Sequence, residues 1–204
     1  MQPAGYNDSI FINCPFDTQY TPILRAMIFA VYRCGFLPQT ALSEDNALDN
    51  RLDKIERSIA NCRYGIHDIS RTEFNEHDLP RYNMPFELGI FFGAKYFGNK
   101  QQKNKNALIF DVERYRYLEY ISDLNGVDIK AHGNDPFTAI REIRDWLKTT
   151  SGRTTIPGYK LLIKEYQEFL KKLPTITHDL GLNIDDIPFN DYCLIVEETL
   201  KETL

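Results

Sequence analysis

Several short motifs that identify nucleotide- and metal-binding proteins are missing from this sequence. Neither G-x-G-x-x-G nor G-x-x-x-x-G-K-[ST] occurs, which excludes a dinucleotide-binding fingerprint and a P-loop. The four cysteines form no C-x-x-C pair and are not accompanied by clustered histidines. This scatter argues against a zinc site and against a disulfide framework. We therefore expect no bound metal and four reduced thiols that are mostly buried.

Long apolar runs and an excess of basic charge are missing as well. No stretch approaches the roughly 18 apolar residues that a membrane helix needs, and the N-terminal segment has no signal-peptide pattern. The 24 Lys and Arg are outnumbered by 29 Asp and Glu, so the formal charge is -5. Duplex nucleic acid is an unsuitable partner for such a chain, because it is bound through clustered basic residues. We expect a cytoplasmic protein with neither a membrane nor a duplex nucleic-acid partner.

Alternating strand-like and helix-like segments fill most of the chain. Its 204 residues, 43% of them hydrophobic, suffice for a globular core. Short apolar runs predict strands, and apolar residues at helical spacing predict helices. The predicted strands span 9–13, 36–42, 63–68, 107–111 and 127–131, and the predicted helices 17–34, 47–62, 113–124 and the segments that begin near 84 and 135. This alternation indicates a doubly wound α/β fold, in which helices cover both faces of a five-stranded parallel sheet.

No strand-like run remains after Gly152, and two helical stripes of apolar residues follow. One stripe runs from Tyr159 to Leu173 and the other from Tyr192 to Leu200. We therefore divide the chain into an α/β domain, residues 1–152, and a C-terminal helical appendage, residues 153–204. An amphipathic helix must bury its apolar face, so we expect the appendage to pack on the first domain and to contribute to a homodimer. A lid over the ligand site is the competing hypothesis.

The ends of the predicted strands are where a ligand site is expected, because open parallel sheets bind ligands beyond the carboxyl ends of their strands. Asp68 ends the third predicted strand and leads into a polar segment, 69–83, that we interpret as a long loop. The helix that follows begins with Asn83 as its N-cap and carries Pro85 and Glu87 in its first turn. Glu87 would then lie beside the positive end of the helix dipole, which favours an ionised carboxylate.

Two glycines, Gly89 and Gly93, lie four residues apart in the same predicted helix. Each costs up to about 1 kcal/mol relative to alanine. Because small residues let a helix approach a sheet or a ligand closely, we predict such an approach here. The alternative is that Glu87 only stabilises the start of its helix and that Asp68 only binds loop amides.

Two carboxylates at one strand end suit chemistry at the anomeric carbon of a sugar. Cleavage of a glycosidic bond passes through an oxocarbenium-like transition state, which one carboxylate stabilises or attacks while a second group handles proton transfer. We predict that Asp68 and Glu87 line one crevice, with their carboxyl groups within about 10 Å of each other.

Other polar residues near the same strand ends are predicted to bind the ligand. Backbone amides of the first strand-to-helix turn could face an anion, and an arginine of the 69–83 loop could pair with a phosphate, although solvated surface charges are the alternative. The predicted ligand-binding residues are Asn13, Cys14, Asp17, Ser70, Arg71, Arg81 and Asn83. Cys14 is more simply a buried thiol than a nucleophile, since no histidine partner can be named for it. We interpret His67 as a core residue and His132 as a candidate for the crevice.

The motifs of this chain resemble those of bacterial TIR-like domains. The matching places are the helix Ile55–Arg63 (IERSIANCR), the strand end Asp68-Ile69-Ser70 and the helix start Phe86-Glu87-Leu88-Gly89. Phe11-Ile12-Asn13-Cys14 stands where those domains carry their first strand. Asp68 with Glu87-Leu88-Gly89 also resembles the nucleoside 2-deoxyribosyltransferase group, which has a flavodoxin-like fold. The resemblance covers residues 9 to 112, and the phrases FINCPFD and RYGIHDIS resemble an uncharacterised group of bacterial proteins.

The resemblance implies a flavodoxin-like fold and a role for Glu87 at a glycosidic carbon. In the transferases the helical glutamate is the nucleophile, and in NAD-cleaving TIR domains it is the essential acidic residue. The strand-end aspartate that assists it in the transferases corresponds to Asp68. The tryptophan that usually precedes the TIR glutamate is absent here.

Two hypotheses about function follow. The first is an N-glycosidase that cleaves the ribosyl–base bond of NAD or a related nucleotide, with the nucleotide as substrate rather than cofactor; by resemblance, such a protein would serve in bacterial antiphage defence. The second is a non-catalytic nucleotide- or signal-binding TIR-like module that acts through self-association.

Overall fold

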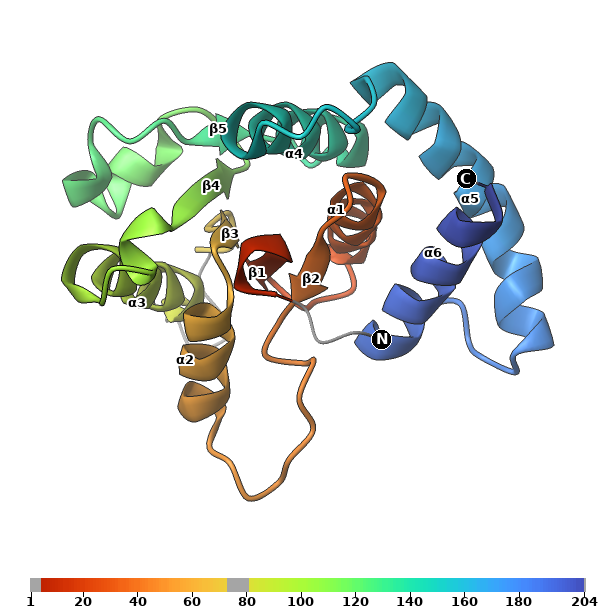
Figure 1. The fold of residues 1–204 in the computed structure, drawn as a ribbon, viewed down its shortest axis with the longest axis horizontal. Coiled ribbons are helices and arrows are strands. Elements are labelled where there is room, and N and C mark those ends of the chain that lie inside the picture. Colours follow the sequence, from red (N-terminus) through yellow and green to blue (C-terminus); the bar gives the residue numbers. More distant parts are fainter. Residues whose placement is uncertain (1–4, 73–80, 204) are drawn as a thin grey trace. The chain divides into compact units, whose positions relative to one another are not determined.

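A parallel five-stranded sheet organises the structure, a computed structural model that describes residues 5–72 and 81–203. The strands lie side by side in the order β2-β1-β3-β4-β5 (Figure 1). Every pairing between neighbours is parallel. This is the flavodoxin-like order of doubly wound α/β folds, so the predicted fold class is confirmed. The strands are β1 (Ser9–Asn13), β2 (Leu37–Gln39), β3 (Tyr64–Asp68), β4 (Asn106–Asp111) and β5 (Lys130–Ala131).

Helices alternate with these strands and then continue alone to the C-terminal end. The α-helices are α1 (Thr21–Arg33), α2 (Arg51–Asn61), α3 (Asn83–Phe97), α4 (Pro136–Ser151), α5 (Tyr159–Asp179) and α6 (Phe189–Thr203). Short 3-10 helices occur at η1 (Tyr6–Asp8), η2 (Gln102–Asn104), η3 (Arg116–Glu119) and η4 (Ser122–Leu124). Much of the predicted loop, residues 73–80, lies outside the described residues.

The helix predicted over 47–62 begins only at Arg51, with Asn50 as its N-cap. Two other predicted helices differ from the structure for local reasons. Helix α1 begins at Thr21 rather than at Asp17, because the carbonyl and side chain of Asp17 accept hydrogen bonds from the Tyr20 and Thr21 backbone amides and close a separate turn. The segment 113–124 contains η3 and η4 instead of one α-helix. Tyr115 has a φ of 66°, in the left-handed region, which a right-handed helix cannot include.

The described chain divides into two compact units. We call Met1–Thr21 with Leu37–Asp135 the sheet unit, and Pro22–Phe36 with Pro136–Leu204 the helical unit. The sheet unit holds all the strands, α2 and α3. The helical unit holds α4, α5, α6 and α1 from Pro22 onward. The division predicted at residue 152 stays a prediction.

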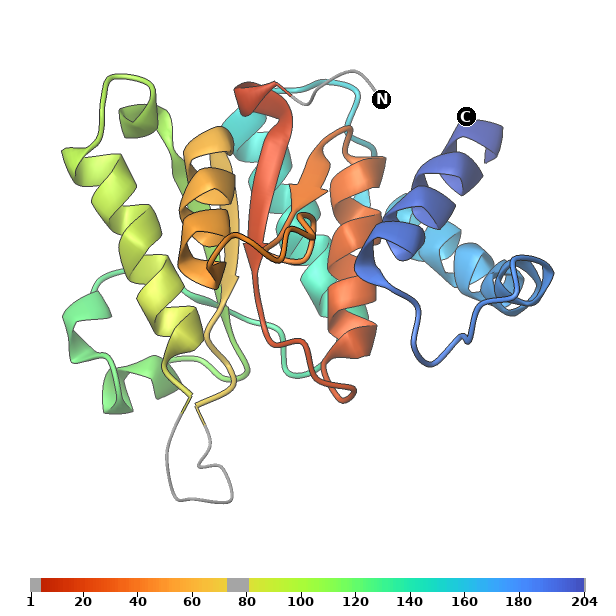
Figure 2. The same cartoon turned by 90° about the horizontal axis from the view of Figure 1, so that it is seen from below.

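Within the sheet unit, α2 and α3 pack beside each other against the strands (Figure 2). A buried cluster joins the strand β1 to both helices through Phe11, Ile55, Ile59, Cys62 and Phe91. On α3, the residues that face this cluster are Phe91 with Ile90 and Ala94 beside it. Glu87 lies one turn earlier on that same face, because residues four apart in a helix share a side.

The helical unit is held together by aromatic side chains. The ring of Phe29 in α1 lies 5.1 Å from that of Tyr166 and 5.4 Å from that of Phe169, both in α5. Phe169 also packs edge-on against Tyr192 of α6, at 6.0 Å. The apolar stripes predicted for the C-terminal segment are thus buried within the single chain, as an amphipathic helix requires.

The helices differ in length and polarity, and both properties bear on membrane insertion. Within residues 5–72 and 81–203, every helix is too short or too polar to cross a bilayer.

Candidate functional site

Buried polar side chains gather at the carboxyl edge of the sheet. Asn13 ends β1, Asp68 ends β3 and Asp111 ends β4, and His132 directly follows β5. All four are buried. A buried polar group without a partner costs free energy, so each of these side chains needs hydrogen bonds or ion pairs. The partners that they find determine which of them remain available to a ligand.

Asp68 is completely buried and has a partner at each oxygen. The Tyr20 hydroxyl donates to Asp68 Oδ2 at 2.5 Å, and the Ser70 backbone amide donates to Asp68 Oδ1 at 2.8 Å. His132 Nε2 lies 2.9 Å from Asp68 Oδ2. Asp68 therefore joins the β1–α1 turn, the end of β3 and the end of β5.

The tautomer of His132 follows from its second ring nitrogen. His132 Nδ1 accepts a hydrogen bond of 2.9 Å from the Asn134 backbone amide. In the neutral ring the hydrogen is then on Nε2, the atom that faces Asp68. Nε2 of His132 nevertheless forms no well-aligned hydrogen bond. Its close neighbour is the carboxylate of Asp68, which makes the contact an electrostatic one. His132 thus lies beside Asp68 at this edge of the sheet, and its place in a ligand crevice stays a prediction.

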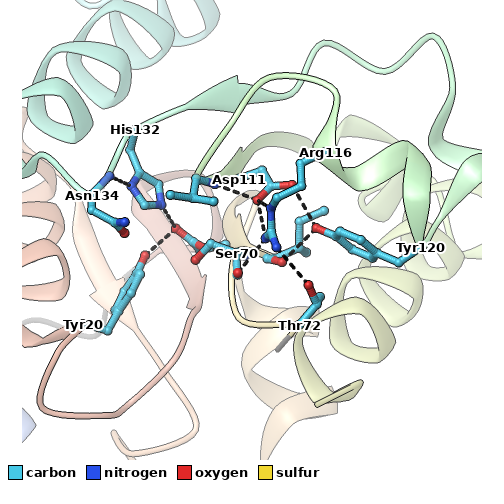
Figure 3. Close-up of polar contacts among 11 residues, drawn as sticks. Tyr20, Ser70, Thr72, Asp111, Arg116, Tyr120, His132 and Asn134 are labelled. Atoms are coloured by element: carbon cyan, nitrogen blue, oxygen red, sulfur yellow. Dashed lines mark hydrogen bonds and ion pairs between the residues drawn. The ribbon is translucent and has the colours of Figure 1, made fainter. Parts of the chain in front are cut away.

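Asp111 forms a second network, beside the first (Figure 3). Arg116 Nη2 lies 2.6 Å from Asp111 Oδ1 and donates at 2.6 Å to the carbonyl of Ser70. The Tyr120 hydroxyl donates to Asp111 Oδ2 at 2.9 Å. The pKa of Tyr120 is raised above its usual value by burial first and then by the charge of Asp111. These contacts hold the segment after β4 against the end of β3.

Glu87 lies deeper in its helix than predicted. Helix α3 begins at Asn83 with Tyr82 as its cap residue, so Asn83 is not the N-cap and Glu87 is the fifth helical residue, past the first turn. The dipole effect is concentrated in the first turn and is therefore weaker at Glu87 than expected. Burial raises the pKa of Glu87, while Arg51 acts to lower it.

Arg51, the first residue of α2, provides the described charge partner of Glu87. Arg51 Nη2 lies 3.6 Å from Glu87 Oε1. The arginine side chain is 56% exposed and the glutamate side chain 7% exposed. The packing of α2 against α3 through Ile55, Ile59 and Phe91 brings the two residues together. Since this ion pair is long and its arginine is half in solvent, it restrains the carboxylate only weakly.

The three buried acidic residues of the sheet unit therefore differ in availability. Asp68 and Asp111 accept short hydrogen bonds from several groups that are themselves fixed. Glu87 has one long contact, to a mobile type of side chain at the surface. Among the described residues, Glu87 is the buried carboxylate with the fewest partners, and its one ion pair is long.

Cys14 and Asn13 lie beside these carboxylates but are engaged in packing. Burial raises the pKa of the Cys14 thiol well above its usual value, and the charges of Asp68 and Glu87 raise it further. The thiol of Cys14 therefore stays protonated. The Asn13 amide donates to the Met84 carbonyl at 2.8 Å and lies 3.2 Å from His67 Nδ1. Asn13 thereby fixes the start of α3 against the sheet.

The remaining predicted ligand-binding residues are dispersed. Arg71 Nη2 lies 3.3 Å from Asp17 Oδ1 and 3.1 Å from Gln19 Oε1, so the structure does bring Arg71 to the first strand-to-helix turn. Ser70 is buried, and both its amide and its carbonyl are bonded within the networks described above. Arg81 is exposed. Ligand binding by these residues stays a prediction, as does the 10 Å separation of Asp68 and Glu87.

The close approach of the helix to the sheet that was predicted at Gly89 and Gly93 is wrong, while an approach to a ligand there stays a prediction. A Cβ atom added at either position would meet nothing within 4 Å. The close approach occurs instead at Gly65 in β3, where a Cβ would lie 2.6 Å from His67 Nε2 and 2.8 Å from Phe91 Cε2. His67 of the same strand and Phe91 of α3 crowd this position, while the two helical glycines have open space beside them.

Tyr20 and Arg51 were not singled out from the sequence. Tyr20 belongs to an apolar spacing that predicts a core position, so its hydroxyl carried no functional signal. Arg51 is one of several charged residues at the start of a helix. Only the contacts of Tyr20 with Asp68 and of Arg51 with Glu87 distinguish them.

The four cysteines are buried and form no disulfide, as expected for Cys14, Cys34, Cys62 and Cys193. Over the described ranges, no group of three or more His, Cys, Asp or Glu side chains is placed to hold a metal ion. None of the known protein-family profiles matches the chain, and no curated protein matches it significantly. The resemblance to TIR-like domains and nucleoside 2-deoxyribosyltransferases therefore stays a prediction.

Proposed function

We propose that this protein cleaves the N-glycosidic bond between ribose and base in NAD or a related nucleotide, with Glu87 acting at C1′. The observation that carries the proposal is the state of Glu87. It is a buried carboxylate near the carboxyl edge of a doubly wound sheet, and its one described partner is a long contact to an exposed arginine. A carboxylate of this kind can stabilise or capture a sugar cation.

The availability of a single open carboxylate favours NAD among the candidate substrates. When the C1′–nitrogen bond of NAD breaks, its electron pair leaves with the base and converts the cationic pyridinium into neutral nicotinamide. The leaving group thus needs no proton. Glu87 meets the developing cation at C1′ as an ion or through an ester. Water then supplies the oxygen at C1′, and its released proton passes to solvent.

The other residues have supporting roles in this proposal. Arg51 offers a positive charge that keeps Glu87 ionised. Asp68 has its oxygens bonded by Tyr20 and Ser70, so it organises the strand edge rather than attacking the sugar. The phosphates are expected at Arg71 and the turn that contains Asp17, where a phosphate can replace the present contact between the two side chains.

The second candidate is a non-catalytic nucleotide- or signal-binding module that acts through self-association. The observation in its favour is Asp68, whose complete burial and saturated hydrogen bonding suit a structural role. Both candidates place a nucleotide at the same edge of the sheet. They differ in whether a bond is broken there.

Incubation with NAD, nucleotides and nucleosides, followed by mass spectrometry for free base, tests the proposal. We expect release of nicotinamide from NAD. The Glu87→Gln variant keeps the shape of the side chain but removes its charge, so we expect kcat to fall at least about 100-fold while NAD binding persists in calorimetry. Glu56→Gln, the same change at an exposed position of α2, is the control and is expected to retain activity.

The outcomes separate the two candidates. Binding of a nucleotide without release of base, unchanged in Glu87→Gln, would support the non-catalytic module. Base release that survives Glu87→Gln would show that another residue acts at C1′.

A further inference from the structure

An apolar groove with an acidic rim lies between α6 and the end of α5, within the helical unit. Its volume is about 500 Å³. Leu180 and Leu194 line it and are 59% and 44% exposed, a high fraction for leucine. Asp191, Glu198 and Glu202 line it as well. Exposed apolar surface that is bordered by charge is typical of a site for a protein partner.

The three acidic residues form one stripe along α6. They are spaced by seven and then four residues, and residues at these spacings lie on one face of an α-helix. Lys201 lies 2.9 Å from Glu198 and also 2.9 Å from Glu197. Exposed ion pairs of this kind contribute little energy, and the stripe retains its negative charge because acidic residues outnumber this single lysine.

A basic stripe of matching spacing runs along α5. Lys160, Lys164 and Lys171 are exposed and are spaced by four and then seven residues. If an α5 helix from another copy lay antiparallel to α6, the matching spacing would put Lys171 opposite Asp191, Lys164 opposite Glu198 and Lys160 opposite Glu202. Each stripe spans about 16 Å, because its two ends are eleven steps apart at a rise of 1.5 Å per residue. Lys164 has only a marginal contact in the single chain, 3.9 Å to Glu168.

The two stripes cannot meet within one chain. The buried face of α5, with Tyr166 and Phe169, packs on α1 and α6. At 3.6 residues per turn, Lys160, Lys164 and Lys171 lie roughly half a turn away from that face. The basic stripe of α5 is therefore turned away from α6, and only the stripe of another copy can reach the groove.

We propose that the groove of one copy binds the basic stripe of α5 from a second copy, with α5 and α6 antiparallel. The charge complementarity and the shared spacing carry this inference, and Leu161, exposed at the edge of the basic stripe, adds apolar contact. The contact is heterologous, because the groove and the stripe lie on different faces. Copies then add head to tail, so assemblies grow beyond a dimer unless a ring closes.

Sedimentation of the whole chain over a range of concentrations and salt tests the proposal. We expect the average mass to rise with concentration at low salt and to fall at high salt, which screens exposed charges. Lys164→Glu and Glu198→Lys are each expected to shift the protein to monomer. Their combination in one chain, or an equal mixture of the two single variants, is expected to restore assembly, because the charges are complementary again.

Lys100→Glu, an equal change of charge at an exposed position of the sheet unit, is the control and is expected to assemble as the unchanged protein does. All these positions are exposed, so melting temperatures should agree and a loss of assembly would not reflect unfolding. A monomer at every concentration at low salt would overturn the proposal. So would assemblies that Lys164→Glu and Glu198→Lys leave intact, or that the double variant fails to restore.

Discussion

Hydrogen bonds and burial distinguish the buried carboxylates of the sheet unit at the scale of single residues. Asp68 and Asp111 each connect several segments. Removing either carboxylate would leave hydrogen-bond donors, such as the Tyr20 hydroxyl, without an acceptor. Glu87 connects only to Arg51 among the described residues. A network of saturated hydrogen bonds gives rigidity, so Asp68 and Asp111 suit a structural role at this edge of the sheet, whereas the function proposed above depends on the less restrained Glu87.

Arg51 gives a prediction about pH. Burial raises the pKa of Glu87 and Arg51 lowers it. In Arg51→Gln the opposing charge is lost, so the pKa should rise further and the acidic limb of the rate profile should move to higher pH. We expect a modest shift, because Arg51 is half exposed and solvent screens its charge.

The profile of kcat/KM against pH measures this shift. Lys54→Gln removes an equal charge one turn further along α2, and we expect the acidic limb of its pH profile to stay at the same pH. A profile that moves equally in both variants would indicate a general effect of net charge. An Arg51→Lys variant should restore part of the original position, since it restores the charge.

Cys14 gives a second prediction at this scale. Burial and the nearby carboxylates raise the pKa of its thiol, and thiols react as thiolates. We expect iodoacetamide at mildly alkaline pH to leave Cys14 unmodified in the folded protein, as followed by mass spectrometry, and to modify it after denaturation. Cys14→Ala should retain base release. Rapid alkylation of native Cys14 together with loss of activity would instead favour a nucleophilic thiol.

Glycine positions show how an element depends on its surroundings. Gly89 is an exposed residue inside α3 with open space where a Cβ would lie, whereas Gly65 in β3 is enclosed by His67 and Phe91. The same residue type therefore has opposite consequences in two neighbouring elements.

The prediction at the scale of elements uses this pair. Gly89→Ala should stabilise the protein by about 0.5–1 kcal/mol, because alanine has the higher helix propensity and restricts the unfolded chain. Gly65→Ala should destabilise it by about 1–3 kcal/mol, the usual cost of overpacking a core. Chemical denaturation measures both changes. Equal effects of the same sign would contradict the packing described for β3 and α3.

Stability against acid is a property of the whole molecule, to which His67 contributes. Burial lowers its pKa from 6.5 to about 3 in the folded protein, with a smaller effect from Lys105. Between these values the unfolded chain binds a proton that the native protein does not bind. The free energy of unfolding therefore falls as pH decreases from 6.5 towards 3, by at most about 1.4 kcal/mol per pH unit for this proton.

Denaturation at several pH values measures that slope. His67→Asn keeps an acceptor for the Asn13 amide and does not titrate in this range, so its slope should be smaller over the same interval. An identical slope in the two proteins would assign the acid sensitivity to other groups.

The sequence by itself determined the sheet, because the signals for strands and helices are local. Strand β1 has the predicted bounds, and β3 and β4 differ from prediction by one residue at their first position. The two edge strands, β2 and β5, are shorter than the predicted ranges 36–42 and 127–131. Parallel order and the position of Asp68 at a strand end follow from that alternation. Local signals failed where a single backbone angle mattered, as at Tyr115, and where a helical glycine could face either way, as at Gly89.

Only the tertiary structure decided how many partners each buried carboxylate has. Tyr20 is 48 residues from Asp68 along the chain, and Arg51 belongs to a different helix from Glu87. Such pairs form because the packing of α2, α3 and the strands brings them together, and no local pattern encodes a partner at that separation. The charged stripes of α5 and α6 likewise depend on both levels. Their spacing is visible in the sequence, whereas the burial of the opposite helix face determines the direction in which each stripe points.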